Sequence, residues 1–103
     1  MIDKHIDDFL VCLDEKRFYD AHESIESVWF PRRFEDCDEV RLLKGFINAA
    51  VSFELNKRGR AKQSEKVWKN YIKYRPLLYK IESKNLNSYH YVARYIEKLK
   101  YGL

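Results

Sequence analysis

The sequence predicts an all-α fold, a compact bundle of about five helices in a single domain that spans residues 1–103. Hydrophobic residues make up 46% of the chain, whereas only three glycines and two prolines are present to interrupt helices. The apolar residues recur at steps of three and four positions, which is the spacing of one helix face. With 103 residues, the chain can form one hydrophobic core but not two.

The first two helices are expected over residues 3–15 and 17–30. The apolar positions with helical spacing are Ile6, Phe9, Leu10 and Leu13 in the first and Phe18, Ala21, Ile25, Val28 and Trp29 in the second. Pro31 should end the second helix, because a proline disfavours helical backbone in the residue before it. Residues 32–37 are expected to form a polar loop.

The longest helix is expected to begin with Asp38 as its N-cap and to end before Gly59. Its apolar residues surround most of the helix circumference: Leu42, Leu43, Phe46, Ile47, Ala49, Ala50, Val51, Phe53 and Leu55. We therefore expect neighbours on several sides and place this helix at the centre of the bundle. Gly45 inside it costs about 1 kcal/mol relative to alanine, which predicts close approach of another helix, with the helix that carries His22 as the candidate.

Two further helices are expected over residues 61–75 and 88–100. The side chains expected to point inward are Val67, Trp68, Tyr71 and Ile72 in the former and Tyr89, Val92, Ala93, Ile96 and Leu99 in the latter. Pro76 should disturb the end of the former helix. Trp29 and Trp68 have aliphatic neighbours at helical spacing, which favours a role as core anchors.

The chain has the features of a cytoplasmic protein with no membrane partner. No apolar stretch approaches the roughly 20 residues that cross a bilayer, and the N-terminus lacks the basic start and apolar run of a secretory signal. Cys12 and Cys37 form neither a C-x-x-C pair nor a disulfide framework, so both are expected as free thiols. The sequence leaves a homo-oligomer open.

Two ionisable residues lie where apolar side chains are expected. On a helical wheel, His22 falls between Phe18 and Trp29, and Glu54 falls within the apolar arc of the longest helix. Glu26 lies at the margin of the apolar side and Glu23 lies outside it. An ionised carboxylate that is buried without a partner costs several kcal/mol. The sequence therefore predicts that His22 and Glu54 meet in or near a cleft between the second and third helices.

The segment His22-Glu23-x-x-Glu26 allows two interpretations of this polar site. In the first, it is a hydrogen-bonded pair with a structural or ligand-binding role. In the second, His22 and Glu26 share a helix face, and Glu54 completes a set of one nitrogen and two oxygens for a divalent metal ion such as zinc, manganese or iron. The chain would then be a metal-dependent enzyme, for example a hydrolase. We favour the first interpretation and keep the second as its alternative.

These residues also carry a resemblance to a known family. The segment Ala21-His22-Glu23-x-x-Glu26-x-x-Trp29, followed by Gly45-x-Ile47-Asn48-x-Ala50 and then by Arg58-Gly59, resembles the domain of unknown function 309 family of small all-helical proteins. The resemblance covers roughly residues 9–75. It implies a helical fold and a site around His22, Glu23, Glu26, Asn48 and Glu54, and it implies no established activity. The chain departs from the family pattern at Lys16, where many members have glycine, and at Glu54, near which many have histidine.

Charge is divided unevenly along the chain. Residues 1–40 contain five basic and twelve acidic side chains, whereas residues 41–103 contain fifteen and four. The basic side chains of one segment are Arg58, Arg60, Lys62, Lys66, Lys69 and Lys73. They allow two interpretations: a solvated helix face that balances the acidic first hairpin, or a surface for nucleic acid or another polyanion. No recognised nucleic-acid module is present, so we favour the solvated face and keep polyanion or nucleic-acid binding through this helix as a second alternative.

Overall fold

The computed structural model describes residues 2–102 and confirms the all-α fold. Its helices are α1 (Ile2–Asp14), α2 (Phe18–Trp29), α3 (Asp38–Lys57), α4 (Ala61–Tyr74) and α5 (Leu86–Tyr101), and two short 3₁₀ helices occupy Phe30–Arg32 and Arg75–Tyr79. No helix among these residues is long and apolar enough to pass through a membrane.

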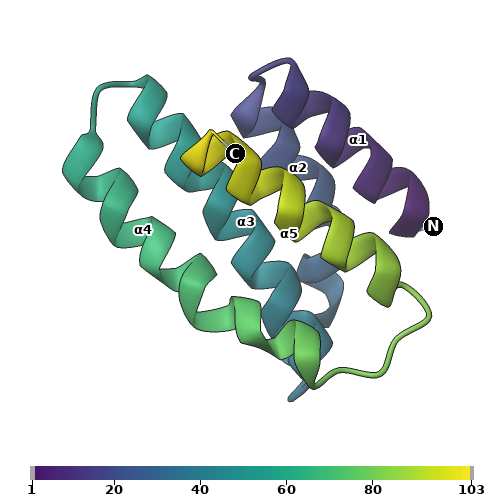
Figure 1. Cartoon of the computed structure of the whole chain (residues 1–103). Helices are drawn as coiled ribbons and strands as arrows, with labels where there is room; N and C mark the ends of the chain where they lie inside the picture. Colours follow the sequence, from purple (N-terminus) through teal and green to yellow (C-terminus); the bar gives the residue numbers. More distant parts are fainter. Residues whose placement is uncertain (1, 103) are drawn as a thin grey trace.

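The central helix is α3, as the sequence predicts. It packs against α2 on one side and α4 on the other, while α1 packs on α2 and α5 lies across α3 (Figure 1). The basic helix α4 therefore lies on the opposite side of α3 from the acidic α1–α2 hairpin. This arrangement differs from the expected balance of charge between the hairpin and the basic segment.

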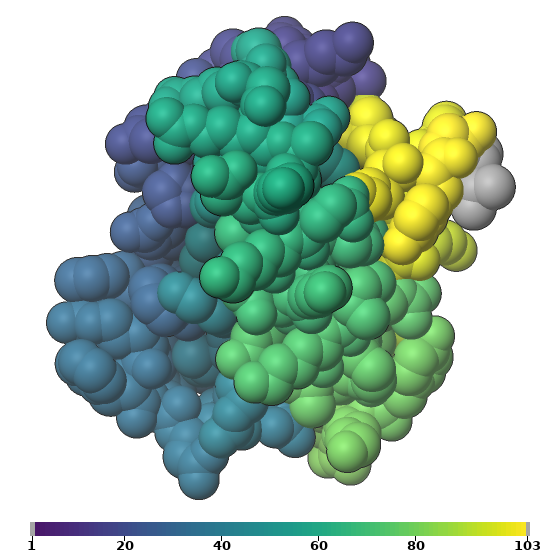
Figure 2. All heavy atoms as spheres, turned by 90° about the vertical axis from the view of Figure 1, so that its left-hand side faces the viewer, coloured from purple at the N-terminus to yellow at the C-terminus, as the bar shows by residue number. Residues whose placement is uncertain are grey.

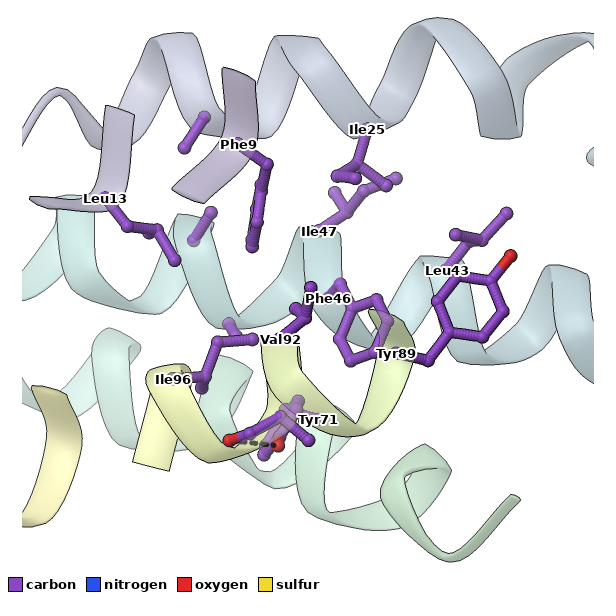
Figure 3. Close-up of a cluster of buried hydrophobic side chains, with 14 of the residues drawn as sticks. Phe9, Leu13, Ile25, Leu43, Phe46, Ile47, Tyr71, Tyr89, Val92 and Ile96 are labelled. Atoms are coloured by element: carbon purple, nitrogen blue, oxygen red, sulfur yellow. Dashed lines mark hydrogen bonds between the residues drawn. The ribbon is translucent and has the colours of Figure 1, made fainter. Parts of the chain in front are cut away.

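The core is formed where all five helices meet. Figure 3 shows part of this cluster and labels side chains from every helix: Phe9 and Leu13 of α1, Ile25 of α2, Leu43, Phe46 and Ile47 of α3, Tyr71 of α4, and Tyr89, Val92 and Ile96 of α5. Trp68 is also buried, as expected of a core anchor, whereas Trp29 is only half-buried. The prediction that Ile72 and Leu99 point inward is wrong, because Ile72 is 45% exposed and Leu99 is 39% exposed. Both residues lie at exposed positions because the neighbouring helices cover only part of the apolar face of α4 and of α5.

The helix ends differ from the prediction in small ways that have local causes. Asp38 is the first residue of α3 and not its N-cap; Cys37 is at that position and gives no side-chain cap. The chain continues as 3₁₀ helix through Pro31 and Pro76, because a helix accepts proline in its first turn. Gly59 follows α3 with φ of 78°, a left-handed conformation that glycine adopts without strain.

The polar side of α3 is covered by α4. A Cβ atom added at Gly45 would lie 3.0 Å from Cβ of Tyr74, so the helix that approaches Gly45 closely is α4 and not α2. Further along, the Ser52 hydroxyl donates to the Ser64 carbonyl at 3.0 Å, and the Ser64 hydroxyl donates to the Ser52 carbonyl at 2.8 Å. Both serines are buried. Their burial is tolerated because these two reciprocal hydrogen bonds satisfy the polar atoms without water.

Candidate functional site

A pocket lies between α2 and α3 and includes the two residues that the helical wheel singled out. Its volume is about 230 Å³, and its lining residues are Phe18, Tyr19 and His22 of α2, Val51, Glu54 and Leu55 of α3, and Arg58 just after α3. Phe18, Val51 and Leu55 supply apolar surface. His22, Glu54 and Arg58 supply the charged and polar groups.

His22 is held by the glutamates of its own helix. Nε2 of His22 contacts the carboxylate of Glu26, one turn further along α2, and Nδ1 lies 3.8 Å from Glu23. The His22 side chain is 20% exposed and that of Glu26 is 35% exposed, so both are at the protein surface and not in the core. Hydrogen bonding to Glu23, together with the charge of that carboxylate, raises the pKa of the neighbouring Tyr19 phenol.

Glu54 also pairs within its own helix turn. Nε of Arg58 donates to the Glu54 carboxylate at 2.7 Å, and the Glu54 side chain is 19% exposed. Within the described residues, His22 and Glu54 form no ion pair with each other, although they line the same pocket. Each residue pairs instead with the residue four positions further on, which is a neighbouring position on a helix surface.

The candidate metal ligands do not gather into a cluster. Residues 2–102 contain no group of three or more histidine, cysteine, aspartate or glutamate side chains that could hold a metal ion. His22 and Glu26 are adjacent, but the third candidate, Glu54, is turned toward Arg58. A metal site of His22, Glu26 and Glu54 stays a prediction.

Asn48 lies away from the pocket, at the contact between α3 and α4. Its side-chain amide donates to the Lys44 carbonyl at 2.8 Å, and its side-chain oxygen accepts from Asn70 at 3.2 Å. The family resemblance grouped Asn48 with the site residues but did not show that another helix packs against it. Asn48 therefore has a different location from His22, Glu23, Glu26 and Glu54.

Sequence reasoning missed most of the apolar wall of the pocket and the role of Arg58. Arg58 was grouped with the basic residues of the next segment, but it also lines the pocket. Its position four residues after Glu54 was the available signal, since that spacing favours an ion pair on a helix. The other members of the basic group, which are Arg60, Lys62, Lys66, Lys69 and Lys73, are exposed along α4.

Comparison with known proteins gives one relationship. No curated protein and no solved structure matches the chain. The family described as "Domain of unknown function (DUF309)" matches residues 6–67, which is more than half of the chain and includes most of α1, all of α2 and α3, and the first half of α4. Both motif segments, from Ala21 to Trp29 and from Gly45 to Gly59, lie inside the match. The chain belongs to the DUF309 family.

Proposed function

We propose that the pocket between α2 and α3 binds a small molecule with an apolar body and a hydrogen-bond acceptor at one end. The observation that supports this proposal is the lining itself, in which apolar side chains of two helices face one another and polar groups stand beside them. Ligand sites are commonly apolar clefts with a few placed polar groups. Pockets for drug-sized ligands measure about 300–1,000 Å³, so a pocket of about 230 Å³ suits a smaller molecule.

Arg58 indicates the chemistry of the polar end. Among residues 2–102 Glu54 engages its Nε, and the two terminal nitrogens have no hydrogen-bond partner there, so they can donate to a ligand. A guanidinium edge matches a carboxylate or carbonyl oxygen well. His22 stands in the same pocket, oriented by Glu26, and offers a second polar contact. The proposed ligand class is thus a small carboxylate or carbonyl compound with an aromatic or branched apolar body.

Phenylacetate, its neutral amide and phenethylamine are matched probes for this pocket. In a titration followed by amide chemical shifts, we expect phenylacetate and the amide to shift the signals of Phe18, Val51 and Leu55, with the amine weakest because it brings a cation to Arg58. Val51→Phe should abolish these shifts by filling the pocket. Ile72→Phe is the matched control, since it makes the same kind of change at an exposed position of α4, outside the pocket.

Two outcomes would overturn the proposal. The first is the absence of pocket shifts with all three probes, or shifts that persist unchanged in Val51→Phe. The second is a metal: protein purified without a metal-affinity tag that contains a stoichiometric divalent ion, lost in His22→Ala, would favour the metal-dependent enzyme instead. The described residues favour ligand binding over that enzyme because Glu54 is paired with Arg58 and no three-ligand cluster forms among them.

A further inference from the structure

The outer face of α4 carries a row of lysines. Lys62, Lys66, Lys69 and Lys73 are all exposed. At 100° per residue they fall within an arc of about 60°, opposite the side that buries Ser64, Trp68 and Tyr71. At 1.5 Å per residue the row extends for about 17 Å along the helix.

The positive charge of this row is not neutralised nearby. Within the part of the chain that the structure describes, none of the four lysines has a carboxylate at ion-pair distance, and Glu65, the one acid of α4, pairs with Lys100 instead. The acidic α1–α2 hairpin lies beyond α3 (Figure 1). An unpaired row of one sign attracts an anionic partner from solution.

A hollow opens beside this row, on the same face of the molecule. In Figure 2 the outer side of α4 faces the viewer, and the surface is recessed between it and the blue segment that follows α2. The hollow has a volume of about 500 Å³, and three aromatic side chains line it, namely Trp29, Phe34 and Tyr74. Phe34 is 88% exposed, so most of its ring is accessible from solvent.

Two cations also line the hollow and stand over its rings. Nζ of Lys44 lies 4.2 Å from the centroid of the Trp29 ring, and the guanidinium of Arg33 lies 4.5 Å from that of Phe34. Among residues 2–102 neither cation has a carboxylate at ion-pair distance. The two acids of the hollow are already paired with cations: Glu35 pairs with Arg32, and Asp36 pairs with Arg41, which also lines the hollow.

Tyr74 connects the hollow to the lysine row. Its ring lines the hollow, and Nζ of Lys73 lies 5.3 Å from its centroid. Polar contacts continue across the gap between the helices, from Asn70 to Asn48 and from Asn48 to the Lys44 carbonyl. The lysine row and the aromatic hollow therefore form one surface, which we call the α4 surface.

We infer that the α4 surface binds single-stranded nucleic acid, with phosphates along the lysine row and an unpaired base in the aromatic hollow. Cations that follow the backbone, combined with aromatic rings on which bases stack, are the features of single-strand binding. A row of about 17 Å is as long as about five stacked nucleotides at about 3.4 Å each. An acidic membrane suits the surface less well, because the apolar side of α4 is buried in the core and cannot enter a bilayer.

The test is fluorescence anisotropy of labelled oligothymidylate and oligouridylate at increasing salt. We expect binding at low salt that weakens with a log–log slope of about −0.7 for each phosphate contact. The triple variant Lys66→Gln/Lys69→Gln/Lys73→Gln should weaken binding at least about tenfold and make the slope about two units less steep. Its matched control is Lys80→Gln/Lys84→Gln/Lys98→Gln, which removes the same charge from exposed positions outside the α4 surface.

A second measurement tests the hollow. Phe34→Ala should weaken binding at least about fivefold if a base stacks there, whereas Tyr91→Ala, at another exposed ring, should leave it unchanged. Bound oligonucleotide should also quench the emission of Trp29, and Trp29→Phe should remove this quenching while buried Trp68 remains. Circular dichroism of each variant checks that it is folded.

Three results would overturn the inference. One is the absence of oligonucleotide binding at low salt, where phosphate contacts are strongest. Another is equal weakening by the two triple variants, which would mean that net charge alone attracts the strand. The third is binding to phosphatidylserine vesicles without binding to either oligonucleotide, which would assign the lysine row to a membrane.

Discussion

Lys16 adopts a backbone conformation that suits glycine better. It lies in the tight connection between α1 and α2 with φ of 59°. Its amide donates to the Leu13 carbonyl at 3.0 Å, and the Arg17 amide donates to the Cys12 carbonyl at 2.8 Å. These bonds close the end of α1 and require a left-handed residue at position 16. For a residue with a Cβ atom, that conformation costs roughly 1–2 kcal/mol.

Lys16→Gly should therefore stabilise the protein. We expect the free energy of unfolding to rise by about 0.5–1 kcal/mol, because the relief of strain exceeds the extra entropy that glycine gives the unfolded chain. Urea denaturation followed by circular dichroism measures the change. Lys16→Ala is the control, since it removes the side chain but keeps the Cβ atom, and it should give no such gain. A less stable glycine variant would contradict this account of the turn.

At the residue scale, the sequence predicted which way the side chains of the site residues point better than it predicted which residues they pair with. The helical wheel turned His22 and Glu54 toward the space between α2 and α3, because helix periodicity fixes which way a side chain points, and both residues line the pocket there. It could not show that α2 and α3 leave space there, so that both residues reach the surface instead of pairing in the core. The i, i+4 partners Glu26 and Arg58 were readable from spacing alone.

Helix α5 is joined to the rest of the bundle by hydrogen bonds from several helices as well as by its apolar side. The Tyr95 hydroxyl donates to Asp14 of α1 at 2.7 Å. The carboxylate of Glu97 on α5 accepts from the Tyr71 hydroxyl of α4 at 2.7 Å and also contacts Arg75. The whole family match precedes this helix, since the match ends at residue 67 and α5 begins at Leu86.

Removal of the Glu97 carboxylate should loosen α5. Glu97→Ala leaves the buried Tyr71 hydroxyl and the Arg75 guanidinium without their acceptor, and hydrogen bonds to charged groups contribute about 1.5–3 kcal/mol. We expect a loss of about 2 kcal/mol in unfolding free energy, with faster amide hydrogen exchange in α5 than in α3.

The matched control for this variant is Glu82→Ala, an exposed glutamate that precedes α5 and forms no ion pair within the described residues. It should change the free energy of unfolding by less than about 0.5 kcal/mol. Equal effects of the two substitutions would show that Glu97 contributes only its charge.

At the scale of elements, the sequence predicted which helices form but not which of their faces pack together. Regular apolar spacing and few helix breakers gave all five helices, with ends within a few residues. The packing of α4 on the Asn48 and Ser52 side of α3 was not predictable, because that side reads as solvent-exposed. The contact is possible because Gly45 lets Tyr74 approach closely and because Ser52 and Ser64 satisfy each other.

Across the whole molecule, charged side chains are separated by sign onto opposite sides, whereas several tyrosines lie between the helices. The acidic hairpin and the basic α4 occupy opposite sides of α3, so the molecule presents two surfaces of opposite sign (Figure 1). Three tyrosines instead lie between helices and donate to carboxylates: Tyr71 to Glu97, Tyr89 to Glu39 and Tyr95 to Asp14. These bonds require the protonated phenol, which connects the stability of the fold to alkaline pH.

The pKa of each of these phenols is raised in the folded protein. Burial is the main cause for Tyr71 and Tyr89, followed by the hydrogen bond to the carboxylate. For Tyr95 the hydrogen bond to Asp14 comes first and raises the pKa to about 12. A raised pKa means that the folded state keeps a proton that the unfolded chain releases near pH 10. The stabilisation is complete below about pH 10 and is lost as pH rises above it.

We therefore expect the free energy of unfolding to be flat near neutral pH and to fall steeply above pH 10. Each tyrosine that ionises only on unfolding lowers it by about 1.4 kcal/mol for each pH unit. Urea denaturation at several pH values measures this slope. Tyr71→Phe should make the slope shallower by about the 1.4 kcal/mol per pH unit that one tyrosine contributes. Tyr91→Phe should leave the slope unchanged, because that exposed hydroxyl has no hydrogen-bond partner among residues 2–102. A slope that Tyr71→Phe leaves unchanged would mean that the buried phenol does not connect alkaline pH to stability.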